Sequence, residues 1–353
     1  MDPLSQAVLG SMASLGAAKV KAKMRQKTKD SSDSNDSNDS NESKETPSLK
    51  VIALWGALAG MAADLDVLIR SSSDPLFHVQ FHRHFTHSLF FIPIGALIVS
   101  LFLKLFRVPV KRSYLYTFCA YATHGLLDSF TNYGTQLFWP LSSTRVALNT
   151  VAVIDPLCTI PLVILVILCL RTKNLKFNDA AIIYVIAFMS LGFYQRERVT
   201  NFLTSKGLIN EQTQRQMIKP TIFNNVIWRG IVVDQDQAKF YAVKSIPFGK
   251  IKLYPKSESA SIVKENEIKN LLKHYKSQKF PYDYERFRSF TSGYLHWGQD
   301  NTIVDSRYSI LPYSSQAMWD IKFHKGEGHV VFNTSRAVDI NSRKEFLKLL
   351  FDF

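Results

Sequence analysis

The chain has 353 residues, a formal net charge of +14 and 46% hydrophobic residues, which allows two units of ordinary domain size. Its three cysteines all lie inside apolar stretches, which excludes a disulfide framework and a cysteine-based zinc motif. The densest basic cluster, between Lys19 and Lys29, directly follows an apolar segment. This placement is typical of charges that set membrane orientation, so we expect no nucleic-acid partner.

Predominantly apolar segments follow one another up to about residue 194. A bilayer core about 30 Å thick needs about 20 such residues in a helix. The candidate crossings are Leu4–Val20, Leu49–Ile69, Ser88–Phe106, Ser113–Phe130, Val151–Leu170 and Asp179–Tyr194. Six crossings fit best, and five, with the first segment lying in the membrane interface, is the alternative. Residues 30–48 include the low-complexity run SSDSNDSNDSNES, which has no apolar residue to bury and predicts a disordered loop.

Lysine and arginine alternate between the joints that connect these segments. The joints at 19–50, 107–112 and 171–176 are rich in them, whereas 70–87 and 131–150 are poor. Because positively charged joints stay in the cytoplasm, the chain is predicted to be a multi-pass protein of the cytoplasmic (inner) membrane. The loop 30–48 is then cytoplasmic, and residues 195–353 lie outside the cytoplasm.

Ionisable residues gather at the end of the segments that this orientation places outside. They come from separate stretches of the chain and comprise Asp64, Asp66, His78, His82, Arg83, His84, His87, His124, Asp128, Arg145 and Asp155. Charged groups within apolar segments are costly and usually mark function. The sequence therefore predicts one polar site at the outer level of the membrane.

Histidine nitrogen and carboxylate oxygen are natural ligands for zinc, manganese or iron. His124 and Asp128 are four apart and share one helix face, whereas Asp64 and Asp66 can both point inward only if their helix ends or unwinds. One divalent metal is predicted to bind Asp64, His87, His124 and Asp128. A second, about 4 Å away, would add Asp66 and His82, an arrangement suited to phosphoester displacement. The alternative for the His124/Asp128 pair is an interhelical hydrogen bond.

These residues lie in motifs that resemble the YdjM-like predicted inner-membrane metal-dependent hydrolases. The matching elements, over roughly residues 1–170, are MDPLSQAVLG, the Asp64-Leu65-Asp66 element, HRHFTHSLFF from His82, THGLLDSFTNYGTQLFWP from Thr123, and Asp155-Pro156. The resemblance implies a membrane-bound hydrolase with a divalent metal held by Asp64, Asp66, His82, His87, His124 and Asp128, with Arg83 in support. The chain departs from the family pattern in having Gln6 where a histidine is usual and His84 where a glycine is usual.

The second half, residues 195–353, predicts a small β-rich α+β domain outside the membrane. Aromatic and β-branched residues alternate with polar ones in TIFNNVIWRGIVVD, AKFYAVKSIPF, SRYSILPY, MWDIKF and GHVVFNT. Helices are expected at Glu265–Tyr275 and near the C-terminus. The predicted fold is thus an α-helical polytopic membrane domain of about six helices, residues 1–194, followed by this domain.

The first functional hypothesis is a metal-dependent hydrolase at the outer face of the membrane, acting on a phosphoester or lipid-linked envelope substrate. Asp66 or Asp128 would steer the proton of the attacking water, and Arg83 or Arg145 would balance substrate charge. The alternative for both arginines is interfacial anchoring. The alternative function is a metal-binding or proton- or metal-transporting membrane protein without hydrolase activity. The inner halves of the segments are almost purely apolar, which argues against a transport path.

Overall fold

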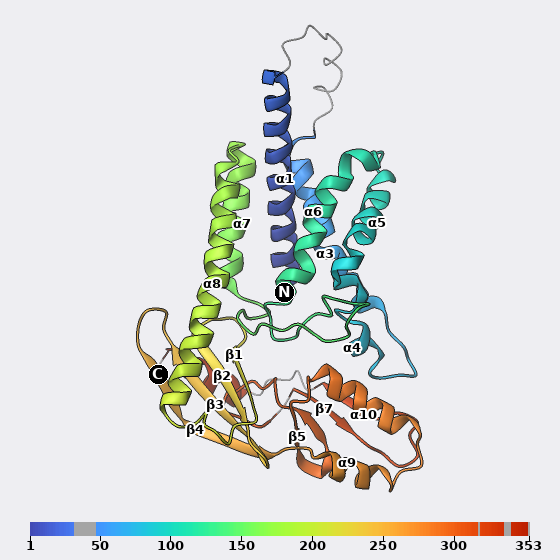
Figure 1. Ribbon diagram of the computed structural model, residues 1–353, viewed down its shortest axis with the longest axis vertical. Coiled ribbons are helices and arrows are strands. Elements are labelled where there is room, and N and C mark those ends of the chain that lie inside the picture. The colour runs from blue at the N-terminus through green and yellow to red at the C-terminus, as the bar shows by residue number, and fades with distance from the viewer. Residues whose placement is uncertain (32–46, 317, 335–339, 352–353) are drawn as a thin grey trace. The chain divides into compact units, whose positions relative to one another are not determined.

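The computed structural model describes residues 1–31, 47–316, 318–334 and 340–351 (Figure 1). Its helical N-terminal region is followed by a C-terminal region that contains two β-sheets. Most of the sequence predicted as the loop 30–48 lies outside the described residues. By packing, the chain divides into two compact units. Unit 1 comprises Met1–Asp66, Arg83–Ala147 and Val153–Met189, and unit 2 comprises Val67–His82, Leu148–Ala152 and Ser190–Phe353.

The helices of the N-terminal region coincide with the predicted apolar segments. In chain order the helical elements are α1 (Pro3–Ser31), α3 (Leu49–Ala62), η2 (Ala63–Leu68), α4 (Phe77–Phe81), η3 (Phe85–His87), η4 (Leu89–Phe91), α5 (Ile92–Lys104), α6 (Val110–Asp128), α7 (Pro156–Thr172) and α8 (Lys176–Ser205). Asp155 caps α7 by accepting from the backbone N–H of Leu157, and Pro156 occupies the first turn, where no N–H is needed. The helix α8 begins before the predicted segment and continues beyond it.

Candidate membrane spans are fewer than the six predicted crossings. Within the described ranges, two helical stretches are long and apolar enough to span a membrane, Leu49–Leu68 and Lys176–Ser205. A bent pair, Phe77–His87 with Leu89–Lys104, brings the number to three if it forms one span, and Pro156–Thr172 is a shorter apolar helix. The region therefore has two to three candidate spans by length and composition.

Close packing of glycines joins α1 to its neighbour α3. A Cβ at Gly60 would lie 2.4 Å from the Gln6 carbonyl oxygen, and one at Gly10 would lie 2.3 Å from the Gly56 carbonyl oxygen. Small residues at such positions let helix backbones approach one another, as is common in membrane bundles. Further contacts join α1 to α6 and α7, and α6 to α3 and α5. The N-terminus of α1 is thereby held beside the polar ends of α3 and α6 (Figure 1).

The C-terminal region contains two four-stranded antiparallel sheets, ordered β1-β2-β3-β4 and β5-β6-β7-β8. Their strands are β1 (Arg215–Pro220), β2 (Ile227–Val233), β3 (Gln237–Ser245), β4 (Ile251–Ser261), β5 (Leu295–Trp297), β6 (Ile303–Asp305), β7 (Trp319–Lys322) and β8 (Val331–Thr334). The remaining helices are α9 (Glu265–Leu272), α10 (Lys279–Phe290) and α11 (Ile340–Phe351), with the short η5 (Gln299–Asn301). The prediction of a β-rich region after the helices is confirmed.

One predicted strand, SRYSILPY at residues 306–313, is wrong: this segment forms turns. The buried Arg229 guanidinium binds its backbone, donating to the carbonyl oxygens of Ser306 at 2.9 Å, Pro312 at 2.7 Å and Ser314 at 2.9 Å. Carbonyls directed at one guanidinium are not available for a strand ladder. The neighbouring β6 uses Ile303–Asp305 instead.

Candidate metal centre

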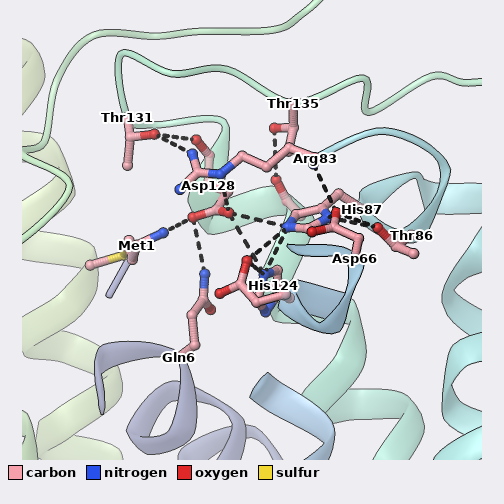
Figure 2. Close-up of polar contacts among 12 residues, drawn as sticks. Met1, Gln6, Asp66, Arg83, Thr86, His87, His124, Asp128, Thr131 and Thr135 are labelled. Carbon is pink, nitrogen blue, oxygen red and sulfur yellow. Dashed lines mark hydrogen bonds and ion pairs between the residues drawn. The ribbon is translucent and has the colours of Figure 1, made fainter. Parts of the chain in front are cut away.

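Four potential ligand atoms from three separate elements converge in unit 1: Asp64 Oδ1 of η2, His87 Nε2 of η3, and His124 Nε2 and Asp128 Oδ2 of α6. The two histidine Nε2 atoms are 3.0 Å apart, and each lies 3.3 Å from Asp64 Oδ1. Asp128 Oδ2 lies 3.4 Å from the His87 nitrogen and 3.7 Å from the His124 nitrogen. Figure 2 shows the rings of His87 and His124 directed toward the Asp128 carboxylate.

His124 is oriented by the backbone of α3. Its Nδ1 contacts the carbonyl oxygen of Gly60, which can only accept a hydrogen bond, so the proton sits on Nδ1. The Nε2 atom of a neutral ring then carries the lone pair that a metal needs. The glycine at position 60 allows α1 to approach α3 at this level, and the fully buried His124 ring follows from this packing.

His87 is oriented by a carboxylate and a hydroxyl. Its Nδ1 lies 3.3 Å from Asp66 Oδ2 and 2.9 Å from Thr86 Oγ1, while the Thr86 hydroxyl donates to Asp66 at 2.8 Å. Because the carboxylate only accepts, Nδ1 carries the proton and Nε2 is again the acceptor. A Cβ at Gly125 would lie 2.0 Å from the His87 carbonyl oxygen. Glycine at this position is therefore needed for η3 to pack against α6.

Asp64 and Asp66 lie in the 3₁₀ turn η2 that follows α3. This change of helix type meets the condition under which both could face a site. Asp64 belongs to the four-atom group, whereas the buried Asp66 accepts hydrogen bonds from the Arg83 backbone N–H and from Thr86, each at 2.8 Å. The Asp64 side chain is 22% exposed, and those of His87, His124 and Asp128 are enclosed. Among these four side chains, the group is therefore open only beside Asp64.

Asp128 is bound on its other sides by donors. Its Oδ1 accepts from Gln6 Nε2 at 3.1 Å and contacts the Met1 α-amino group, and its Oδ2 pairs with Arg83 Nε at 3.0 Å (Figure 2). Arg83 also donates from Nη1 to Thr131 Oγ1 at 2.9 Å. These contacts fix the carboxylate and offset part of its charge. Gln6 thus contacts the group through Asp128.

The donor set fits a divalent transition metal. Ligand bonds of about 2.0–2.2 Å in a tetrahedron place neighbouring ligand atoms about 3.3–3.6 Å apart, which is close to the 3.0–3.7 Å separations among these four. The Oε1 atom of Gln6 adds a buried acceptor that has no hydrogen-bond partner in the described parts of the chain. Two unprotonated ring nitrogens 3.0 Å apart repel one another unless a cation or a shared proton lies between them.

Two other predicted site residues, Arg145 and His82, lie outside the four-atom group. Arg145 reaches the site's edge, where its guanidinium carbon lies 5.4 Å from the Tyr133 ring that Arg83 also faces at 4.8 Å. His82 ends α4 and belongs to unit 2, whereas Asp64, Asp66, Arg83, His87, His124 and Asp128 all lie in unit 1. Thr86, Thr131, Tyr133 and Gly60 also contact or position residues of the site and were not predicted from the sequence. The first three lie within the quoted motifs, which was the one signal available for them.

Comparison with known proteins identifies relatives of the helical region. The chain is 30% identical over 113 residues to the "Uncharacterized protein YfhP" of Bacillus subtilis (strain 168). This match covers 31% of the chain and about a third of that relative's length, 34%. No solved structure matches the chain significantly. The model of the family described as YdjM inner membrane protein matches residues 1–199, which include every residue of the site, the helices α1 to α7 and most of α8. The chain therefore belongs to the YdjM inner membrane protein family.

Proposed function

We propose that the protein is a membrane-bound metal-dependent hydrolase that acts on a phosphoester at the outer face of the cytoplasmic membrane. The observation that carries the proposal is the convergence of four acceptor atoms, two ring nitrogens and two carboxylate oxygens. The measured distances between pairs of these atoms are 3.0–3.7 Å. The second contacts of the two rings, to Gly60 and Asp66, leave their Nε2 atoms directed at the Asp64 and Asp128 carboxylates. Such preorganisation is typical of metal sites supported by outer contacts.

Asp64, His87, His124 and Asp128 would hold the metal, which could be zinc, manganese or iron. When bound, such an ion lowers the pKa of water and polarises a phosphoryl oxygen. Four protein atoms complete a tetrahedral zinc shell, so hydrolysis requires a fifth position or a metal of higher coordination number. The partly exposed Asp64 lies where that position would open.

The surrounding residues would act mainly by positioning. Asp66 holds the His87 ring in its tautomer, and Arg83 fixes Asp128 by the 3.0 Å ion pair. Because Arg83 is 3% exposed and already paired, we assign substrate contact to the half-buried Arg145 before Arg83. Transfer of a proton from the attacking water to Asp66 or Asp128 stays a prediction.

The proposal also includes the number of membrane crossings and the side of the membrane on which residues 195–353 lie. We propose six crossings with residues 195–353 outside the cytoplasm, because joints rich and poor in lysine and arginine alternate along the sequence. This orientation would place the polar group at the outer level of the membrane. A cysteine-accessibility measurement on intact cells, with single cysteines at Ser142 and Thr172 in a variant whose native cysteines are replaced, would test it. Labelling of only the Ser142 variant by an impermeant reagent is expected, and the reverse would contradict the orientation.

The central experiment measures bound metal in the detergent-purified protein by elemental mass spectrometry. The parent is expected to carry near-stoichiometric zinc, manganese or iron, and a variant with His124→Ala and Asp128→Ala is expected to carry none. A soluble phosphoester, bis(p-nitrophenyl) phosphate, then tests hydrolysis by the metal-loaded protein. If the parent stays empty after incubation with each metal, the hydrolase proposal is wrong. A shared proton between the two histidines, as in a proton-coupled path, would then explain their 3.0 Å approach.

A further inference from the structure

Two loops at one end of the sheet β1-β2-β3-β4 expose large apolar side chains. One loop connects β1 to β2 and the other connects β3 to β4, so both lie at the same end of this antiparallel sheet. Exposed apolar groups that gather in one place typically mark an interaction surface. We call these side chains the apolar tips; they are Ile222, Phe223, Ile246 and Phe248.

The two phenylalanines of the apolar tips have left-handed backbone conformations, with φ of 67° at Phe223 and 57° at Phe248. Bulky residues rarely adopt positive φ, whereas glycine, asparagine and aspartate do so at lower cost. Packing within the chain compensates little of this cost, because the side chains are 52% and 83% exposed. A strained backbone that presents an aromatic ring to the surroundings points to a partner outside the chain.

The end of α8 holds the bases of both loops. Val199 and Leu203 of α8 pack on the sheet in one apolar cluster. One turn earlier in α8, the buried Gln195 side chain donates from Nε2 to the carbonyl oxygens of Ser245 at 2.6 Å and Asn225 at 3.4 Å. Because these two carbonyls belong to the bases of different loops, one residue of α8 fixes both loops. All of these residues lie in unit 2.

The same turn of α8 places the β3–β4 loop beside the end of a candidate membrane span. Arg198 donates to the carbonyl oxygens of Ile246, at 2.6 Å, and Gly249. The Phe248 ring stacks on the Tyr194 ring with centroids 5.4 Å apart. Tyr194 ends the apolar stretch of α8, and tyrosine at the end of a span typically lies at the membrane interface. The tips are therefore held at the level where α8 leaves its apolar stretch.

The charges at the two ends of the sheet favour a lipid surface as the partner. Residues 221–226 and 246–252 contain no carboxylate, and the second range ends in lysines at positions 250 and 252. The β2–β3 turn at the opposite end carries Asp234 and Asp236. Aromatic side chains flanked by lysine suit the head-group region of a bilayer, whereas carboxylates there are unfavourable. One end of the sheet is thus suited to the membrane and the other to water.

We propose that the apolar tips insert into the head-group region of the bilayer that α8 crosses and thereby fix the orientation of this sheet on the membrane surface. The partner is phospholipid. The inference requires α8 to cross the membrane and does not depend on the proposed hydrolysis.

The test measures contact between the tips and lipid in the full-length protein, with its native cysteines replaced, in vesicles of phosphatidylcholine and phosphatidylglycerol. An environment-sensitive fluorophore is attached to a single cysteine, either Lys250→Cys beside one tip or Gln235→Cys in the opposite turn. A phosphatidylcholine with a nitroxide near the head-group end of one acyl chain quenches the fluorophore on close contact. The nitroxide lipid is expected to quench the reporter at position 250 several-fold more strongly than the reporter at position 235.

Substitutions then show whether the apolar tips cause this contact. Phe223→Asp together with Phe248→Asp is expected to lower quenching at position 250 several-fold, although aspartate suits the positive φ better than phenylalanine. Phe223→Leu together with Phe248→Leu keeps the tips apolar and is expected to retain the quenching. Tyr282→Asp is the matched control, because Tyr282 is an exposed aromatic residue of α10, and it should leave the quenching unchanged.

Equal quenching at positions 250 and 235 in the parent would overturn the inference, and so would unchanged quenching in a folded variant with both aspartates. Circular dichroism in the same vesicles shows whether that variant is folded, and the comparison of the two reporters in the parent decides the question without it. The measurement needs neither metal nor substrate. Quenched tips on a protein that binds no metal would therefore support the membrane contact and contradict only the hydrolase.

Discussion

Two groups of acidic residues and histidines in this molecule have similar composition and opposite character. The first, in unit 1, comprises Asp64, His87, His124 and Asp128, and the second, in unit 2, comprises Asp74, Asp283 and His329. In the second group one guanidinium binds both carboxylates: Arg286 binds Asp74 through two bonds of 2.7 and 2.9 Å and Asp283 through one of 2.5 Å. In the first group Arg83 pairs with Asp128, whereas Asp64 faces the two histidine rings. Ligand-type residues near one another are therefore not sufficient to identify a metal site.

The histidines make the difference explicit. His329 has both ring nitrogens engaged, since Nδ1 lies 3.0 Å from Asp283 Oδ2 and Nε2 lies 3.1 Å from the Lys279 ammonium. His124 instead uses Nδ1 on a backbone carbonyl and directs Nε2 toward the other candidate ligands. The direction of the lone pair, rather than the identity of the residue, separates a candidate metal site from an ion-pair network.

The largest expected effect is on metal content, and it should separate the two groups completely. His124→Ala removes one of four converging atoms and is expected to abolish stoichiometric metal binding. His329→Ala, the matched change in the second group, is expected to leave the metal content unchanged. Elemental mass spectrometry of both variants beside the parent measures this. Equal loss of metal in both would mean that the second group also binds metal or that unit 2 is needed to form the site.

Disrupting the second group is instead expected to lower the stability of the protein. Arg286→Met leaves the Asp74 and Asp283 carboxylates close together in unit 2 without their cation. Breaking a fully buried pair costs about 3–5 kcal/mol in the free energy of unfolding, and a smaller loss is expected here because Asp74 is 18% exposed. Thermal unfolding in detergent, followed by tryptophan fluorescence, should show a lowered midpoint while the bound metal stays stoichiometric. An unchanged midpoint would mean that the network is solvent-screened and does not hold the segment around Asp74 to α10.

How far these groups could be predicted from sequence depends on the kind of contact. The i,i+4 spacing of His124 and Asp128 and the placement of charges at one end of apolar segments were sufficient to name the first group. The 3₁₀ turn that aims Asp64 could only be stated as a condition, because local spacing does not fix helix type. The role of Arg286 could not be predicted, since its partner Asp74 is 212 residues away. The turns at 306–313 likewise depend on the distant Arg229.

Asp66 offers a smaller and more selective test of the first group. Asp66→Asn keeps the size of the side chain but weakens its interaction with His87 Nδ1 and with the Thr86 hydroxyl. Loss of such an outer contact typically lowers metal affinity about 10- to 100-fold. Competition with a chelator of known affinity would measure the change. If Asp66→Asn binds no metal at any concentration, Asp66 is itself a ligand, as a two-metal arrangement requires.

The smallest expected effect concerns His296, a third buried histidine with both ring nitrogens engaged. Its Nδ1 contacts Ser306 Oγ at 2.8 Å and its Nε2 donates to the Ser315 carbonyl oxygen at 3.0 Å. Burial, aided by the nearby Arg229 guanidinium, lowers the pKa of His296 to about 4. The unfolded chain binds this proton near pH 6.5, so the contribution of neutral His296 is present above that pH and is lost as pH falls toward 4. Between pH 7 and 5 the loss is about 2 kcal/mol. Urea unfolding of the parent and His296→Gln at both pH values isolates this contribution, because the variant should lose correspondingly less stability on acidification. If the parent and the variant lose the same stability, the acid sensitivity of the C-terminal region comes from its carboxylates. His296, with both ring nitrogens engaged, would then neither bind metal nor contribute to the pH dependence of stability.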